Sequence, residues 1–118
     1  MKIAVVGSRQ CDGRGAVEYF IGSLAAKAPN TVIVSGGAKG VDSWAAEAAR
    51  KAGLTVEVYP ADWETYGKGA GFIRNSTIVE KSDKVTAFWD QHSKGTADTI
   101  KKARAAGKLA GIIVIKTL

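Results

Sequence analysis

The amino-acid sequence predicts an α/β fold with three layers, in which about five parallel strands form one sheet and helices cover both of its faces. Short β-branched apolar runs alternate along the chain with longer segments of helical periodicity, the pattern of parallel strands joined by crossover helices. The length of 118 residues fits one core of ordinary size. We therefore assign residues 1–118 to a single domain.

Five apolar runs of similar length and β-branched content are expected to form the strands. In chain order they cover residues 3–6, 32–34, 56–58, 85–88 and 112–115. Right-handed crossovers between parallel strands favour the spatial order 3-2-1-4-5. Ligands bind such sheets at the carboxyl ends of the strands, beside the point where the winding reverses. The loops after the first, second and fourth strands are therefore the expected site.

Four segments have the spacing of apolar residues that is typical of helices. The predicted helices cover residues 17–28, 41–52, 71–81 and 96–106. Pro29, Gly53 and Gly107 follow three of these segments as stop signals. The connection over residues 59–70 is rich in aromatic residues and glycine, and we predict a long loop there.

Composition excludes several classes of protein. Hydrophobic residues make up 46% and charged residues 24% of the chain, which is ordinary for a globular protein and disfavours disorder. No apolar run approaches the roughly 20 residues of a membrane helix, so we expect no membrane partner and a cytoplasmic location. Cys11 and His92 are each single, so we expect no metal site and no Cys/His or Ser/His/Asp catalysis.

Three loops carry groups that bind anions, which fits the net charge of +6. They are residues 7–9 (GSR) after the first strand, 35–42 (SGGAKGVD) after the second and 90–96 (DQHSKGT) after the fourth. Glycine lets backbone amides approach a phosphate, and a helix N-terminus adds N–H groups and partial positive charge. Glycine also makes tight turns, so any one loop has that alternative explanation. Their convergence favours a phosphate-binding crevice.

The spacing of the glycines disfavours two common classes of nucleotide-binding protein. It matches neither G-x-x-x-x-G-K-[ST] nor G-x-G-x-x-G, which disfavours a kinase-like NTPase and an ordinary NAD dehydrogenase. Arg74 is placed to clamp a phosphate bidentately. The rings of Trp63 and Tyr66 either stack on a base or pack the long loop onto the domain.

Five short motifs occur in order along the chain: GSR, SGGAKGVD, YP, IRN and SKGT. This combination resembles the SLOG superfamily, which joins the Rossmann domain of DNA-processing protein A (Smf) to the Lonely Guy phosphoribohydrolases. The segment ADWETYGKGAGFIRN and the later FWD are similar to the small stand-alone YspA-type branch. The resemblance implies a Rossmann-like fold over nearly the whole chain.

The resemblance also implies residues that line a nucleotide pocket, namely Gly7, Ser8, Arg9, Gly36, Gly37, Gly40, Asp42, Arg74, Asn75, Gly95 and Thr96. The three loops add further ligand-binding candidates, namely Ser35, Lys39, Asp90 and Ser93. Phosphoribohydrolases carry P-G-G-x-G-T-x-x-E before the last helix and use its glutamate in catalysis. Thr99 stands at that position here. Asp90 and Asp98 are the remaining candidates for a catalytic acid, although their spacing departs from the family pattern.

Three functions fit these observations. The first is binding or sensing of a nucleotide or nucleotide-derived phosphorylated ligand, with no cofactor required. The second, a nucleoside-monophosphate phosphoribohydrolase-like N-glycosidase, is disfavoured by the missing glutamate, so we expect binding without turnover. The third is binding of single-stranded DNA or other nucleic acid, as in DNA-processing protein A, and the positive charge supports it.

We also expect a homo-oligomer, for which a dimer is the simplest closed form. The last strand is predicted at an edge of the sheet, where its backbone groups are free to pair. Trp44 adds a large apolar surface to a short alanine-rich helix, where it serves either the core or a subunit contact.

Overall fold

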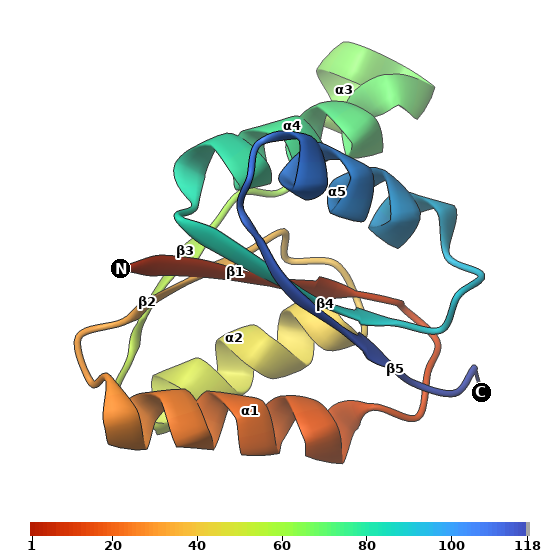
Figure 1. The fold of residues 1–118 in the computed structure, drawn as a ribbon. Coiled ribbons are helices and arrows are strands. Elements are labelled where there is room, and N and C mark those ends of the chain that lie inside the picture. The colour runs from red at the N-terminus through yellow and green to blue at the C-terminus, as the bar shows by residue number, and fades with distance from the viewer. Residues whose placement is uncertain (118) are drawn as a thin grey trace.

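A parallel sheet of five strands forms the centre of the structure, a computed structural model that describes residues 1–117 (Figure 1). The strands are β1 (Lys2–Gly7), β2 (Val32–Ser35), β3 (Thr55–Val58), β4 (Lys84–Trp89) and β5 (Leu109–Val114). Their order is β3-β2-β1-β4-β5, and every neighbouring pair is parallel. The predicted fold class and strand order are confirmed.

Helices cover both faces of the sheet, as Figure 1 shows. One face carries α1 (Arg14–Lys27) and α2 (Val41–Lys51), and the other carries α4 (Ala70–Lys81) and α5 (Lys94–Ala105). All four predicted helices are present, with ends that differ by up to three residues from those predicted. The carboxyl ends of β1 and β4 therefore lie between two helical layers.

Alternating residues of β1 divide the core into two halves. Val5 belongs to a buried cluster with α1 and α2. Ala4 and Val6 belong to a second cluster, which includes Ile78 of α4 and Ile100 of α5. Successive side chains of a strand point to opposite faces, so one central strand contributes to both clusters. Burial on both faces and pairing on both edges hold β1 in place.

β5 begins earlier than the sequence predicts. The predicted strand covers residues 112–115, whereas the observed strand is Leu109–Val114. Its first residue pairs with Val85 of β4, and the register is irregular just beyond that pair. Ala110 and Gly111 have low β-propensity, so the local signal is weak there and pairing with β4 overrides it.

The segment predicted as a long loop contains two short helices, α3 (Trp63–Tyr66) and η1 (Gly67–Gly69). Asp62 caps α3, because its carboxylate accepts a hydrogen bond from the Thr65 amide at 3.1 Å. An N-cap aspartate is a readable signal for a helix start, but a single turn is too short for apolar periodicity. In Figure 1, α3 projects beyond α4 on the side away from the sheet.

β3 and β5 are the outer strands of the sheet within residues 1–117. β5 thus has the edge position predicted for it, and the homo-oligomer stays a prediction. Trp44 is half-buried and packs against the α1–α2 side of the core. Of its two predicted roles, this contact fits the one in the core. No helix in the described part of the chain is long and apolar enough to cross a bilayer.

The loop after β2 packs directly against the loop after β1. Gly40 has φ +79°, and a Cβ there would lie 2.5 Å from the carbonyl oxygens of Ser8 and Arg9. The next amide, that of Val41, donates to the Ser8 carbonyl at 3.2 Å. This contact leaves no space for a side chain at position 40, and it fixes the start of α2 against the end of β1.

We predict that Gly40→Ala lowers the free energy of unfolding by about 2 kcal/mol or more, because it adds a steric clash to an unfavourable φ. Gly53→Ala is the matched control, since Gly53 has φ +82° but a Cβ there would meet no atom within 4 Å. Urea denaturation of both variants measures the difference. Equal losses would show that the close approach at Gly40 contributes nothing.

Candidate ligand-binding site

A pocket of about 540 Å³ opens at the carboxyl ends of β1 and β4, where the winding of the sheet reverses. Its wall includes eleven of the residues singled out from the sequence, namely Gly7, Ser8, Arg9, Asp42, Trp63, Arg74, Asn75, Asp90, Ser93, Gly95 and Thr96. Candidates from all three predicted loops and from α4 therefore meet at one place.

Six of the ligand-binding and stacking candidates do not line this pocket, namely Ser35, Gly36, Gly37, Lys39, Gly40 and Tyr66. Five of them belong to the loop after β2, whose glycines serve packing. A Cβ on Gly36 would collide with the Arg74 guanidinium and would lie 2.7 Å from Asp42 Oδ2. The tight-turn explanation therefore holds for most of this loop, which presents only Ala38 and Asp42 to the pocket.

The pocket wall also contains residues that sequence reasoning missed. Lys68 and Phe72 come from η1 and the first turn of α4, and Thr117 comes from the C-terminal segment. Phe72 stands three residues before Asn75, so helical spacing could have placed both on one face. No local pattern marks Thr117, which reaches the site through an antiparallel bridge with Cys11.

Ser8 connects the loops around the pocket. Its amide donates to the Phe88 carbonyl at 3.1 Å, and its buried hydroxyl accepts from the Asp90 amide at 3.2 Å. Its carbonyl accepts from the Val41 amide at 3.2 Å and from the Cys11 thiol at 3.6 Å. A buried side chain with these partners is structural, even though Ser8 lies on the pocket wall.

Asp42 is a buried carboxylate in the first turn of α2, with 5% of its surface exposed. Its Oδ2 accepts from the Ala38 amide at 3.4 Å. Burial raises the pKa of Asp42 to about 6, and the charge of Arg74, the amides of Ala38 and Gly7, and Arg9 oppose that rise. The carboxyl is therefore mostly ionised at neutral pH and places a negative charge in the pocket wall.

Asp90 is a second carboxylate of the wall, and it organises the loop after β4. Its Oδ1 accepts from the amides of His92 and Ser93, both at 2.9 Å, and its Oδ2 accepts from Thr117 Oγ1 at 3.1 Å. Burial raises the pKa of Asp90, but these hydrogen bonds and that of Ser8 outweigh it and lower the pKa to about 2. Asp90 is ionised throughout the physiological range.

The N-terminus of α5 faces the pocket. Ser93 caps the helix, because its hydroxyl accepts from the Thr96 amide at 3.4 Å, and its carbonyl is held by the Trp89 indole at 3.0 Å. Within residues 1–117, the amides of Lys94 and Gly95 have no acceptor, and a Cβ on Gly95 would meet no atom within 4 Å. This helix end combines free N–H groups with open space.

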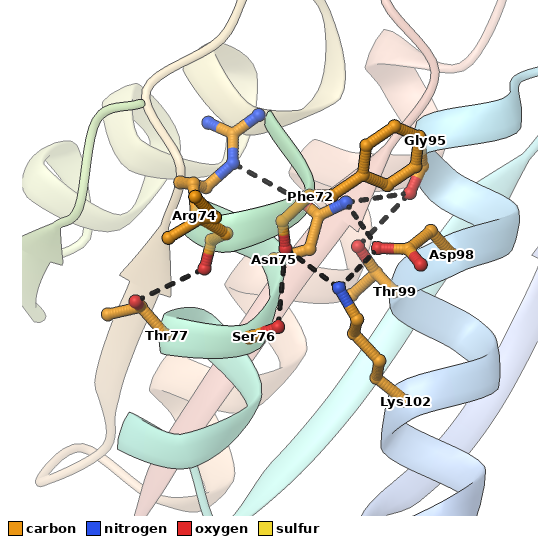
Figure 2. Close-up of polar contacts among 10 residues, drawn as sticks. Phe72, Arg74, Asn75, Ser76, Thr77, Gly95, Asp98, Thr99 and Lys102 are labelled. Carbon is orange, nitrogen blue, oxygen red and sulfur yellow. Dashed lines mark hydrogen bonds and ion pairs between the residues drawn. The ribbon is translucent and has the colours of Figure 1, made fainter. Parts of the chain in front are cut away.

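Asn75 links α4 to the start of α5, as Figure 2 shows. Its Nδ2 donates to the Gly95 carbonyl and to Asp98 Oδ2, both at 3.1 Å, and its Oδ1 accepts from Arg74 Nε at 3.3 Å. Arg74 also donates from Nη1 to the Gly36 carbonyl at 2.7 Å. Asn75 therefore positions the Arg74 guanidinium relative to the α5 N-terminus.

The two remaining catalytic positions differ in placement. Asp98 is absent from the pocket wall, and it pairs with Lys102 at 2.8 Å and with Asn75 across the α4–α5 contact (Figure 2). Thr99 does line the pocket, but its hydroxyl donates to the Gly95 carbonyl at 3.2 Å. The position where the family pattern has glutamate therefore carries a hydroxyl that is already hydrogen-bonded.

Cations outnumber carboxylates around the pocket. Arg9, Lys68 and Arg74 line it, against Asp42 and Asp90. Arg74 forms no ion pair within 4 Å in the part of the chain that is described, although its charge acts on the neighbouring Asp42 and lowers the pKa of that carboxyl. The same residues contain no group of three or more His, Cys, Asp or Glu side chains that could hold a metal ion.

Comparison with known proteins gives relatives in sequence and in fold. The model of the YspA, cpYpsA-related SLOG family (YAcAr) matches residues 1–66, which extend from β1 to the end of α3. The Gene 61 protein of Mycobacterium phage D29 is 34% identical over 113 residues, and the match covers 90% of each chain.

Two solved structures of DNA processing protein A have a similar fold. The protein from Streptococcus pneumoniae gives a TM-score of 0.75 at 26% identity over 93% of this chain. The protein from Helicobacter pylori, described for its single-stranded DNA binding mode, gives 0.70 at 23% identity over 92% of this chain. The chain spans only 49% and 63% of these two structures, respectively.

We predict that Asp42 makes the stability of the protein depend on pH. Its native pKa of about 6 exceeds the ordinary value of 3.8, so the native state binds more protons than the unfolded state between these values. The free energy of unfolding should therefore fall as pH rises from about 4 to about 6. Asp42→Asn should remove most of this fall.

Urea titrations at several pH values measure the effect. Asp90 acts in the opposite sense and at lower pH, because its pKa is lowered to about 2 and its contribution is lost as pH falls below 3.8. Glu18→Gln, on the exposed surface of α1, is the control and should keep the decline of the parent protein. An Asp42→Asn variant with the same decline would contradict the assignment.

Proposed function

The chain belongs to the YspA, cpYpsA-related SLOG family, and from that premise we propose that it binds a nucleotide or nucleotide-derived phosphorylated ligand in the pocket at the carboxyl ends of β1 and β4. The observation that carries the proposal is that Arg74 and the N-terminus of α5 share this one pocket. A full positive charge and free backbone amides together are the groups that recognise phosphate.

We place the phosphate of the ligand at the N-terminus of α5. The unpaired amides of Lys94 and Gly95 donate to phosphate oxygens, and the open space at Gly95 lets the ligand approach the backbone. Arg74 adds its guanidinium from α4, held in place by Asn75. Ser93 and Thr96 supply hydroxyl groups on the same wall.

The mouth of the pocket suits an aromatic base. Trp63 and Phe72 line it and keep 53% and 49% of their surfaces exposed. Exposed rings at a pocket mouth provide flat apolar surfaces on which a base stacks. Tyr66 is 51% exposed but lies outside the wall, so we assign stacking to Trp63 and Phe72.

We propose that this binding proceeds without hydrolysis. Cleavage of an N-glycosidic bond needs a carboxylate that stabilises positive charge or activates water. Thr99 offers no carboxylate, and Asp98 is paired with Lys102. Asp90 already accepts three hydrogen bonds, two from its own loop and one from Thr117. Binding or sensing therefore fits these residues better than N-glycosidase activity.

Removal of Arg74 tests the proposal. Arg74→Ala should weaken the binding of nucleoside 5′-monophosphates by about tenfold or more, because it removes a charge-assisted hydrogen bond to phosphate. Isothermal titration calorimetry with the four common ribonucleotides measures the affinity. Arg104→Ala, on the exposed outer face of α5, is the matched control and should bind like the parent protein. A folded Arg74→Ala variant with unchanged affinity would exclude Arg74 from the site.

A second candidate function is the binding of single-stranded DNA. The Helicobacter pylori structural neighbour was described for this activity, and the aromatic mouth of the pocket offers the stacking surface that such binding uses. Lys68 beside the mouth and the net charge of +6 favour a phosphate backbone.

Fluorescence anisotropy with a labelled oligothymidylate tests this candidate. If it holds, affinity falls steeply with salt, and Trp63→Ala weakens binding by about tenfold, as expected for loss of one stacking contact. Tyr19→Ala is the control, because Tyr19 is 79% exposed on α1, on the opposite face of the sheet. Equal losses in both variants, or no binding at low salt, would rule out the candidate.

A further inference from the structure

A second hollow lies on the face of the sheet that carries α1 and α2. It is a groove of about 530 Å³ between α1 and the β4–β5 edge of the sheet. Six of its eight lining residues are apolar or aromatic, and the other two are Ser23 and Lys27. The groove shares no lining residue with the pocket at the carboxyl ends of β1 and β4, so it is a separate site.

Two helices leave part of this face of the five-stranded sheet uncovered. α2 packs against β1, β2 and β3, and α1 lies beside α2. Among residues 1–117, α1 and α2 are the only helices on this face (Figure 1). The β5 end of the face therefore has no helix beyond α1, and the groove lies there.

The apolar side chains of the groove keep part of their surface exposed. Phe20 and Leu24 of α1 are half-buried, and so is Ile113 of β5. Phe88 of β4 is 1% exposed and contacts the ring of Phe20 edge-on, with ring centroids 5.8 Å apart. The groove volume lies within the roughly 300–1,000 Å³ of pockets that hold one small molecule. An apolar ligand of that size would cover these side chains.

Lys27 adds a positive charge to this apolar groove. It is an exposed residue in the last turn of α1, and it forms no ion pair within 4 Å in the described part of the chain. None of the lining residues is a carboxylate. The lining residues of α1 extend from Ala16 to Lys27, a rise of about 16 Å along the helix. The groove therefore combines an apolar length with a cation at one end.

We infer that this groove binds a small amphiphilic carboxylate. The apolar part of the ligand lies against Phe20, Leu24 and Ile113, and its carboxylate pairs with Lys27. Charge favours this occupant over a second copy of the chain, because two copies with a net charge of +6 each repel one another, whereas an anion is attracted. The inference adds a second site to the proposed function and does not depend on it.

Isothermal titration calorimetry with dodecanoate, below its critical micelle concentration, tests the inference. We expect saturable binding that tightens from octanoate to dodecanoate by up to about fourfold per methylene, as expected for burial of the chain. Dodecyltrimethylammonium has the same chain length but a positive headgroup. It should bind about tenfold more weakly or worse, because it loses the attraction of Lys27 and meets a like charge.

Two substitutions of exposed side chains test the two parts of the groove. Lys27→Gln should weaken dodecanoate binding about threefold, as expected for loss of an exposed ion pair. Ala16→Trp should weaken it by about tenfold or more, because the indole occupies the apolar surface of the groove. Lys101→Gln, on the exposed side of α5 and on the opposite face of the sheet, is the matched control and should bind like the parent protein.

Nuclear magnetic resonance of the amides locates the ligand. Titration with dodecanoate should shift the amides of α1 and β5. Shifts confined to α4 and α5, no binding to the folded protein, or an unchanged affinity in Lys27→Gln would each overturn the inference. A dimer in light scattering that Ala16→Trp dissociates would assign the groove to a second copy and would overturn it as well.

Discussion

Four hydrogen bonds at Ser8 hold the pocket together. Through its amide, hydroxyl and carbonyl, this residue binds the end of β4, the loop after β4, the start of α2 and the Cys11 thiol. The residue is buried, so water cannot replace these partners. The two sides of the sheet reversal are fixed to each other at this point, and Arg74 of α4 and the N-terminus of α5 lie around the pocket that results.

The sequence determines the fold well because its signals are regular where the core is built. The apolar runs of β1 and β4 are buried on both faces, and apolar residues recur at helical spacing in the four long helices, least regularly in residues 71–81, so these elements can be identified from the sequence alone. β5 and α3 are less well predicted, because their boundaries depend on partners. Ala110 and Gly111 are strand residues only through pairing with β4, and α3 is one turn held by its Asp62 cap.

The position of the candidate site was predictable from the sequence. Which of its residues face a ligand and which serve packing was not. A glycine in a loop leaves space, and the sequence does not state whether a ligand or the protein fills it. At Gly40 the backbone of the β1 loop fills it, whereas at Gly95 it stays open. The sequence likewise does not show whether Asn75 contacts a ligand or the protein. In the structure its side-chain amide donates to the Gly95 carbonyl of α5 and accepts from Arg74, so Asn75 orients Arg74. Only the three-dimensional arrangement separates the residues that contact a ligand from those that hold them.

The C-terminal segment has a practical consequence for anyone who attaches another group to this protein. Lys116 accepts from the Asp12 amide through its carbonyl, and Thr117 binds Asp90 at the rim of the pocket. The chain starts at the far end of β1, at the amino edge of the sheet, and Figure 1 shows the two ends of the chain on opposite sides. A fluorophore, affinity tag or surface tether belongs at the N-terminal end of β1, because Thr117 lines the pocket and binds Asp90 there.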